Sequence, residues 1–305
     1  MKNIILSLVL LFSLLHTAGA QNDPHAFDPP WNKPWNDGLS FTVAGVDNVP
    51  DLYGDISDPE LVVFFAGNQF MVIDDLLVAF KKAYPSYTRI FAETLPPGIL
   101  AQQIDHGALT MGNMRITLTP DVYTAGKARI LEQEKRFSRR EVYAKNQLAI
   151  MVRKGNPKNI KGLADLSRND VLVTMPNPEW EGIGKKIEDA YRKVGGGALR
   201  KKIMEEKVDD HTTFLTTIHH RQTPMRLLYG ASEAGPVWYT EAYYQQMLHH
   251  PVEMVKLSEQ ENIGAEYMAG QLKDAPHPQA AHDFMDFLVS HEAKAIYKHY
   301  GFITD

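Results

Sequence analysis

The feature that most constrains the fold is an uninterrupted apolar run of six residues, Leu61–Ala66, followed by a turn and a helical pattern. A strand whose side chains are all apolar is typical of a sheet that is buried on both faces. The turn is Gly67-Asn68-Gln69, and apolar residues at helical spacing continue over residues 70–83 before Tyr84-Pro85 ends the helix. This order of strand, loop and helix predicts an α/β fold with a largely parallel sheet.

The same alternation recurs along the chain. Further strands are predicted at residues 87–91, 147–152, 171–174 and 234–239, and further helices at 99–106, 181–193, 199–206, 223–229 and 277–299. The length exceeds what one hydrophobic core usually supports. We therefore expect two lobes, each a mostly parallel sheet flanked by helices.

The first 20 residues are predicted to be a signal peptide. Lys2 supplies a positive charge, an apolar run of 12 residues covers 4–15, and Ala18-Gly19-Ala20 forms a small-residue cleavage site. The run is too short to cross a bilayer, which takes about 20 residues, so we expect an exported protein without membrane insertion. Residues 21–58 are rich in Pro, Asn, Asp and Trp and are interpreted as an irregular N-terminal extension, with a possible short strand at Phe41–Val46.

Composition and motifs exclude several kinds of chemistry. The chain has no cysteine, which rules out disulfides, thiolate metal sites and cysteine nucleophiles. Its 32 basic and 37 acidic residues give a net charge of −5, and no segment is basic enough to follow a phosphate backbone, so we expect no nucleic-acid partner. The sequence has no Gly-x-Ser-x-Gly elbow, no His-Glu-x-x-His and no dinucleotide fingerprint. We therefore expect neither enzymatic activity nor a cofactor.

Four segments carry a family pattern: Val63-Phe64-Phe65-Ala66-Gly67-Asn68, residues 146–166, Ala234-Gly235-Pro236-Val237-Trp238-Tyr239, and residues 280–302. Their order resembles the periplasmic solute-binding proteins of ABC importers, specifically the molybdate-type oxyanion binders, over residues 60–305. The resemblance implies a ligand cleft between lobe 1 (residues 59–145 plus 240–305) and lobe 2 (residues 146–239). It also implies a monomeric periplasmic protein that captures a small anion and delivers it to a membrane permease.

Ligand residues are expected where strands end and helices begin, because helix N-termini there present unpaired N–H groups and partial positive charge. In lobe 1 the predicted ligand residues are Gly67, Asn68 and Gln69, followed by Thr94 and Gly98 in the next such loop. The resembling family usually places serine hydroxyls in these two loops, and this chain does not. The resemblance therefore predicts the architecture of this chain better than it predicts the identity of its ligand.

The sharpest signal in lobe 2 is His219-His220-Arg221-Gln222-Thr223-Pro224. Arginine offers a planar fork to an oxyanion, and histidine is a donor whose charge depends on pH. Pro224 suits a first helical turn, which makes Thr223 a predicted N-cap. We predict that His220, Arg221 and Thr223 contact the anion. Trp238 and Tyr239 are predicted to wall the pocket, although packing in the core or at the hinge is the commoner role for such rings.

Two alternatives stay open at this stage. A protein that binds a ferric-type metal ion would use His219, His220, Tyr239 and Tyr243 as ligands. A periplasmic ligand sensor or an accessory subunit of a respiratory system is the other, and the extension at 21–58 is its only hint.

Overall fold

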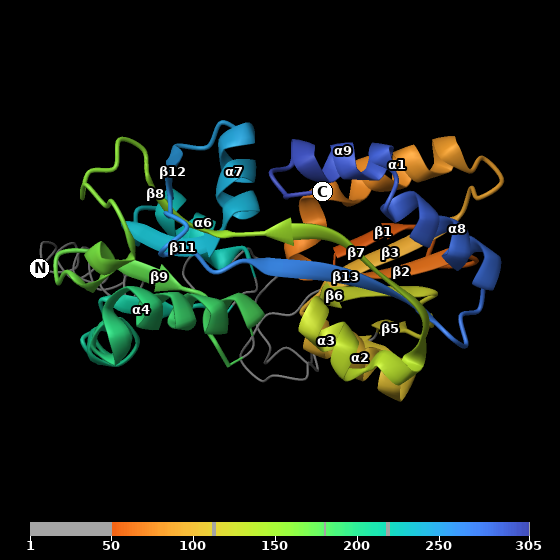
Figure 1. Cartoon of the computed structure of the whole chain (residues 1–305), viewed down its shortest axis with the longest axis horizontal. Helices are drawn as coiled ribbons and strands as arrows, with labels where there is room; N and C mark the ends of the chain where they lie inside the picture. Colours follow the sequence, from red (N-terminus) through yellow and green to blue (C-terminus); the bar gives the residue numbers. More distant parts are fainter. Residues whose placement is uncertain (1–50, 112–113, 180, 218–219, 305) are drawn as a thin grey trace, which may run out of the picture.

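The computed structural model describes residues 51–111, 114–179, 181–217 and 220–304, and these build two lobes, each a sheet with helices on both faces (Figure 1). Lobe 1 contains β1 (Asp51–Gly54), β2 (Leu61–Ala66), η2 (Gly67–Val72), α1 (Ile73–Ala83), β3 (Ile90–Leu95), α2 (Pro97–His106), β4 (Leu109–Met111), β5 (Met114–Ile116), β6 (Val122–Gly126), α3 (Lys127–Glu132), η3 (Glu134–Arg136), β7 (Phe137–Asn146), β13 (Ala265–Leu272), α8 (Pro278–Leu288) and α9 (His291–His299). Lobe 2 contains β8 (Leu148–Arg153), η4 (Leu163–Ser167), β9 (Val173–Met175), α4 (Gly182–Lys201), η5 (Lys202–Glu206), α5 (Lys207–Asp209), β10 (Thr213–Leu215), α6 (Gln222–Leu228), β11 (Ala234–Trp238), α7 (Tyr239–Met247) and β12 (Val252–Lys256). The predicted signal peptide and the predicted strand at Phe41–Val46 lie outside the described residues.

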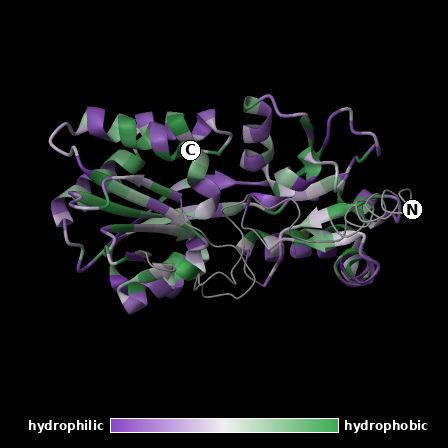
Figure 2. Cartoon of the chain, turned by 180° about the vertical axis from the view of Figure 1, so that it is seen from behind, coloured by the Kyte–Doolittle hydropathy of each residue, from purple (hydrophilic) through white to green (hydrophobic). Residues whose placement is uncertain are grey.

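The sheet of lobe 1 has the strand order β1-β3-β2-β6-β13-β7. Strands β3, β2 and β6 run parallel, whereas β1 and β13 pair antiparallel with their neighbours. Every residue of β2 is buried, as its apolar run predicts. Val63 and Phe65 pack with residues of α1, α8 and α9, whereas Val62 and Phe64 pack with residues of α2 and α3 on the other face. Lobe 1 is therefore a three-layer α/β unit, with its apolar residues concentrated between the layers (Figure 2).

The sheet of lobe 2 has the strand order β10-β9-β11-β8-β12. Strands β10, β9 and β11 run parallel, and β8 and β12 complete the sheet in antiparallel pairing. Ile187 of α4 belongs to the cluster on one face, with Ile150 of β8. Leu227 of α6 and Ala242 of α7 belong to the cluster on the opposite face, with Met151 of β8. The described part of the chain contains no helix with the length and apolar character that crossing a membrane requires.

The path between the lobes corrects two predictions. The chain leaves lobe 1 at the junction of β7 and β8, as predicted, but returns only after β12, because β12 pairs with β8 over five residue pairs and α7 packs against both strands. The predicted resumption of lobe 1 at residue 240 therefore moves to residues 257–264. The sheets are also mixed rather than mostly parallel, because β1, β7 and β13 in lobe 1 and β8 and β12 in lobe 2 take part in antiparallel pairs.

The end of the predicted extension is ordered structure. Asp51–Gly54 forms β1 and pairs with β3, with Asp51 opposite Thr94. Gly54 has a φ of +80°, and a Cβ atom there would lie 2.0 Å from the carbonyl oxygen of Ile90, so only glycine fits where β1 turns away from the sheet. The last part of the segment predicted as an irregular arm is thus an edge strand of lobe 1.

Candidate functional site

Side chains from the two lobes meet through Asp51, the first residue of β1. Thr94, near the carboxyl end of β3, donates its hydroxyl to Asp51 Oδ2 at 2.8 Å. Arg221, the residue that precedes α6 in lobe 2, forms an ion pair with Asp51 Oδ1 through its Nη2 atom. The carboxylate of Asp51 therefore joins a predicted donor of lobe 1 to a predicted donor of lobe 2.

Aromatic rings border this ion pair. The guanidinium carbon of Arg221 lies 5.8 Å from the centre of the Phe70 ring, and Phe70 contacts Tyr244 of α7 edge-on, with the ring centres 5.6 Å apart. The side chains of Arg221 and Asp51 stay 34% and 26% exposed, so the rings shield the ion pair from water only in part. We refer to Asp51, Phe70, Thr94, Arg221 and Tyr244 as the interlobe junction.

Two buried carboxylates hold His220, which the sequence predicts as a ligand donor. Its Nδ1 atom forms an ion pair with Glu241 Oε1, and its backbone N–H donates to Glu181 Oε2 at 3.3 Å. Burial opposes its charge, but Glu241 and Glu181 outweigh burial and raise the pKa of His220. Burial also raises the pKa of Glu181, against the influence of His220 and of the Thr216 hydroxyl. The charge of protonated His220 is therefore balanced within lobe 2, and Arg221 carries the positive charge that faces lobe 1.

The first predicted ligand turn opens the 3₁₀ helix η2 with Gly67 and Asn68, and both are buried. Asn68 donates its Nδ2 to the hydroxyl of Tyr267 on β13. Asn146, at the crossover between β7 and β8, donates its Nδ2 to Thr240 Oγ1 of α7 at 2.9 Å and to the same tyrosine hydroxyl at 3.5 Å. A buried chain of hydrogen bonds thus runs from η2 past the crossover to the start of α7.

Gln69 lies inside lobe 1 and is fully buried. Its Oε1 accepts hydrogen bonds from the hydroxyls of Tyr143 and Tyr297 at 2.8 and 2.9 Å, and its Nε2 donates to Thr124 Oγ1 at 3.2 Å. Both ends of the amide are engaged within the lobe. These contacts favour a structural role over the ligand contact that the sequence predicts.

The second predicted loop is shorter than expected. Thr94 belongs to β3 rather than to a loop, because it pairs with Asp51 on one side and Phe65 on the other. Helix α2 begins at Pro97, so Gly98 lies in its first turn. Thr94 is nevertheless next to the carboxyl end of β3, where ligand residues are expected in this kind of fold.

Thr223 does not cap α6 as predicted. Arg221 holds the N-cap position without a side-chain capping bond, and Thr223 is a buried residue inside the helix. A Cβ atom on Gly235 would lie 2.4 Å from Thr223 Cγ2, so glycine in β11 lets α6 approach the sheet closely at this point. Thr223 therefore packs α6 onto β11, and its predicted donation to a ligand has no support in its position.

Trp238, Tyr239 and Tyr243 form packing contacts. Trp238 is buried in the core of lobe 2, and the rings of Tyr239 and Tyr243 stack with centres 5.9 Å apart. Both tyrosine rings lie beside Gly301, where an added Cβ would be 3.0 Å from each. The sequence left two roles open for such rings, pocket wall and packing in the core or at the hinge. The contacts of these three rings favour packing.

The alternative metal site gains no support from the described residues. Within them, no group of three or more His, Cys, Asp or Glu side chains is arranged to hold a metal ion. His220 is engaged with Glu241, and His219 lies outside the described residues.

Sequence reasoning missed three acidic residues of this region, namely Asp51, Glu181 and Glu241. Glu181 is the N-cap residue of α4 and Glu241 lies in the first turn of α7. Both helices follow strands, β9 and β11. The expectation that functional residues lie where a strand ends and a helix begins, which identified Gly67, therefore also applies to Glu181 and Glu241. Asp51 gave no such signal, because it lies within the segment at 21–58 that was interpreted as an irregular extension.

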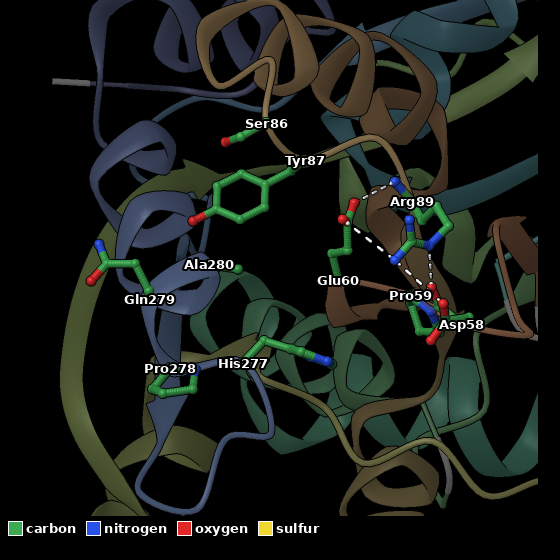
Figure 3. Close-up of a pocket in the computed structure, with 10 residues that line it drawn as sticks. All are labelled: Asp58, Pro59, Glu60, Ser86, Tyr87, Arg89, His277, Pro278, Gln279 and Ala280. Carbon is green, nitrogen blue, oxygen red and sulfur yellow. Dashed lines mark hydrogen bonds and ion pairs between the residues drawn. The ribbon is translucent and has the colours of Figure 1, made fainter.

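A cavity of about 420 Å³ lies elsewhere, at the amino ends of β2 and β3 (Figure 3). Glu60, Tyr87, Arg89 and His277 are among the residues that line it. Glu60 and Arg89 form an ion pair there at 3.4 Å, and the Tyr87 hydroxyl donates to Asp283 at 2.6 Å. Because ligands of open α/β sheets bind at the carboxyl ends of strands, the interlobe junction is the stronger candidate for the binding site.

The two lobes, the strand crossovers between them and the polar contacts at the interlobe junction define a two-lobed binding protein. The chain matches the family of bacterial extracellular solute-binding proteins over residues 61–303. It belongs to that family of solute-binding proteins. The chain has no significant match among curated protein sequences.

Solved structures of low sequence identity share the fold. The periplasmic molybdate-binding protein of Azotobacter vinelandii superposes with a TM-score of 0.65 at 17% identity, covering 80% of this chain and 99% of that one. The sulfate-binding protein SubI of Mycobacterium tuberculosis gives 0.62 at 18% identity, covering 80% and 86%. Iron-bound HitA of Pseudomonas aeruginosa gives 0.60 at 15% identity, covering 78% and 83%. At these identities the similarity establishes the fold alone.

Proposed function

We propose that this protein captures a small oxyanion of the molybdate, tungstate or sulfate type in the periplasm and delivers it to the permease of an ABC importer. The observation that carries the proposal is the position of the Asp51 carboxylate between Thr94 Oγ1 and the Arg221 guanidinium. A carboxylate is itself an oxyanion with two accepting oxygens. Donors from opposite lobes that hold it are chemically suited to hold a free oxyanion.

The charges of the site fit one anion. Arginine offers two parallel N–H groups to an oxyanion, and hydrogen bonds between ionised partners are about twice as strong as neutral ones. The nearby acids Glu181 and Glu241 contact His220, whereas the ion pair of Arg221 is with Asp51, at the position proposed for the anion. The solved relatives that bind molybdate and sulfate support this ligand class.

Capture by both lobes provides a route to closure. A ligand drives a conformational change only if it binds one state more tightly than the other. An anion that contacts Thr94 of lobe 1 and Arg221 of lobe 2 satisfies this condition, because it makes both contacts only when the lobes are together. The direct crossover between β7 and β8 at Gln147 is the expected hinge.

The test is a thermal-shift panel and calorimetric titration of the mature protein with sodium molybdate, tungstate, sulfate and phosphate, and separately with ferric ion. An oxyanion at 100 times its dissociation constant should stabilise the folded state by about 2.7 kcal/mol. Arg221→Ala should weaken its binding by about 10-fold or more, because hydrogen bonds to a charged group contribute about 1.5–3 kcal/mol.

Arg192→Ala is the matched control, since Arg192 is a half-exposed arginine on α4 of the same lobe that pairs with Asp189. The control should bind the anion as tightly as the wild type. Stabilisation by ferric ion and by none of the oxyanions would refute the proposal. Unchanged oxyanion affinity in Arg221→Ala would remove the interlobe junction from the binding site.

A further inference from the structure

We infer that Asp51 is a specificity-determining residue of the binding site: its carboxylate occupies the anion position, and an incoming ligand must displace it. The inference rests on the proposed function and adds to it an internal competitor that sets the affinity threshold. Asp51 uses one carboxylate oxygen for Thr94 of lobe 1 and the other for Arg221 of lobe 2. An oxyanion that bridges the same two donors cannot bind while Asp51 does.

The position of Asp51 in the fold makes displacement easy. It is the first residue of β1, and β1 is a four-residue strand at the edge of the lobe 1 sheet. A strand at the edge of a sheet has a ladder partner on one side only, so it opens locally at a lower cost in free energy than a central strand. The Asp51 side chain is already 26% exposed, so its carboxylate has solvent beside it to move into.

The donors stay in place when Asp51 leaves. Thr94 is 2% exposed and lies within β3, paired with β2 as well as with β1. Arg221 keeps its contact with the Phe70 ring at 5.8 Å. The site that remains has one guanidinium and one hydroxyl, aimed from opposite lobes at the position that the carboxylate has vacated.

This arrangement selects among anions. A ligand replaces Asp51 only if it attracts Arg221 and Thr94 more strongly than a tethered carboxylate does. A dianion such as molybdate or sulfate meets that condition through its second charge, whereas a free monocarboxylate such as formate only equals Asp51 and lacks the advantage of the tether. The wild type should therefore bind dianions and reject formate.

The experiment compares the wild type with Asp51→Ala and Asp58→Ala by calorimetric titration with sodium molybdate, sodium sulfate and sodium formate. Asp58 is the matched control, because it removes the same charge seven residues away, where its side chain is 85% exposed and pairs with Arg89. A partly exposed ion pair and one hydrogen bond together correspond to a change of about 5- to 20-fold in affinity. Asp51→Ala should bind the dianions tighter by that factor and acquire measurable formate binding, and Asp58→Ala should stay within about two-fold of the wild type.

Each other outcome decides against the inference. Equal or weaker dianion binding by Asp51→Ala refutes it and leaves the proposed function standing if Arg221→Ala still weakens binding. An equal gain in dianion affinity in Asp58→Ala also refutes it, because the loss of any negative charge would then explain the gain. Binding of no oxyanion by any variant refutes the proposed function together with the inference. Asp51→Asn, which keeps the shape of the side chain, replaces Asp51→Ala if circular dichroism shows that the alanine variant is unfolded.

Discussion

Replacing Gln69 with leucine separates a structural role from a ligand-binding one at the first predicted ligand turn. Gln69 is fully buried, and its amide bonds to three hydroxyl groups, those of Tyr143, Tyr297 and Thr124, at 2.8 to 3.2 Å. Leucine has a similar shape but no polar atoms, so the variant leaves these hydroxyls without that partner. A buried polar group that loses its partner costs about 1–3 kcal/mol.

The expected loss is smaller than three such penalties. The rings of Tyr143 and Tyr297 have centres 5.2 Å apart, so their hydroxyls can bond to each other and recover part of the loss. We expect the free energy of unfolding to fall by about 2–5 kcal/mol, which lowers the melting temperature by roughly 3–8 °C for a chain of this size. The affinity for an oxyanion should stay within about two-fold of the wild type, because the amide faces the interior of lobe 1.

The assay is urea denaturation without ligand, followed by calorimetric titration with the anion that the panel identifies. Gln102→Leu on α2 is the matched control, since Gln102 is exposed in the same lobe, and surface changes of this kind alter stability by about 0.5 kcal/mol at most. A Gln69→Leu variant as stable as the wild type but with lost anion binding would refute the structural interpretation. It would restore the ligand role that the sequence predicts.

Two further predictions concern lobe 1. Burial raises the pKa of Glu93 to about 8 from its ordinary 4.5. Between these values folded Glu93 retains a proton that the unfolded chain has lost, so Glu93 should contribute a loss of about 1.4 kcal/mol of stability per pH unit as the pH rises, a contribution that Glu93→Gln lacks. Identical pH dependence of the two urea midpoints from pH 5 to 8 would contradict this. Ser290 accepts a hydrogen bond from the Ala293 N–H at 3.2 Å as the N-cap of α9. Ser290→Ala should therefore lower the free energy of unfolding by about 1 kcal/mol, and an unchanged thermal midpoint in that variant would show that the cap contributes nothing.

The local part of the fold was predictable because its signals are local. The apolar run of β2 is entirely buried, as predicted, and the helical spacing after it corresponds to η2 and α1. The last helix was predicted as one element over residues 277–299, but it is two, α8 and α9, separated at Val289 and Ser290. A serine before a new apolar pattern is an N-cap signal. Ser290 therefore indicates in the sequence that a second helix begins here.

The long-range part was not predictable in the same way. β12 and β13 were missed, and they determine where the chain returns to lobe 1. β13 pairs with β7, more than 100 residues earlier in the chain, so no local pattern indicates the pairing. Thr94 and Arg221 were predicted as ligand residues, and the structure brings them together through Asp51. Asp51 was missed because a contact made by a single residue at a sheet edge produces no repeating pattern in the sequence.

The most direct test of the central claim is a crystal structure of the mature protein grown with sodium tungstate, with the metal located by its anomalous scattering. The account predicts one strong peak between Thr94 Oγ1 and the Arg221 guanidinium, with the Asp51 carboxylate turned away from both. A peak only in the cavity beside Tyr87 and His277, or no peak at tungstate concentrations that saturate the protein in solution, would contradict it.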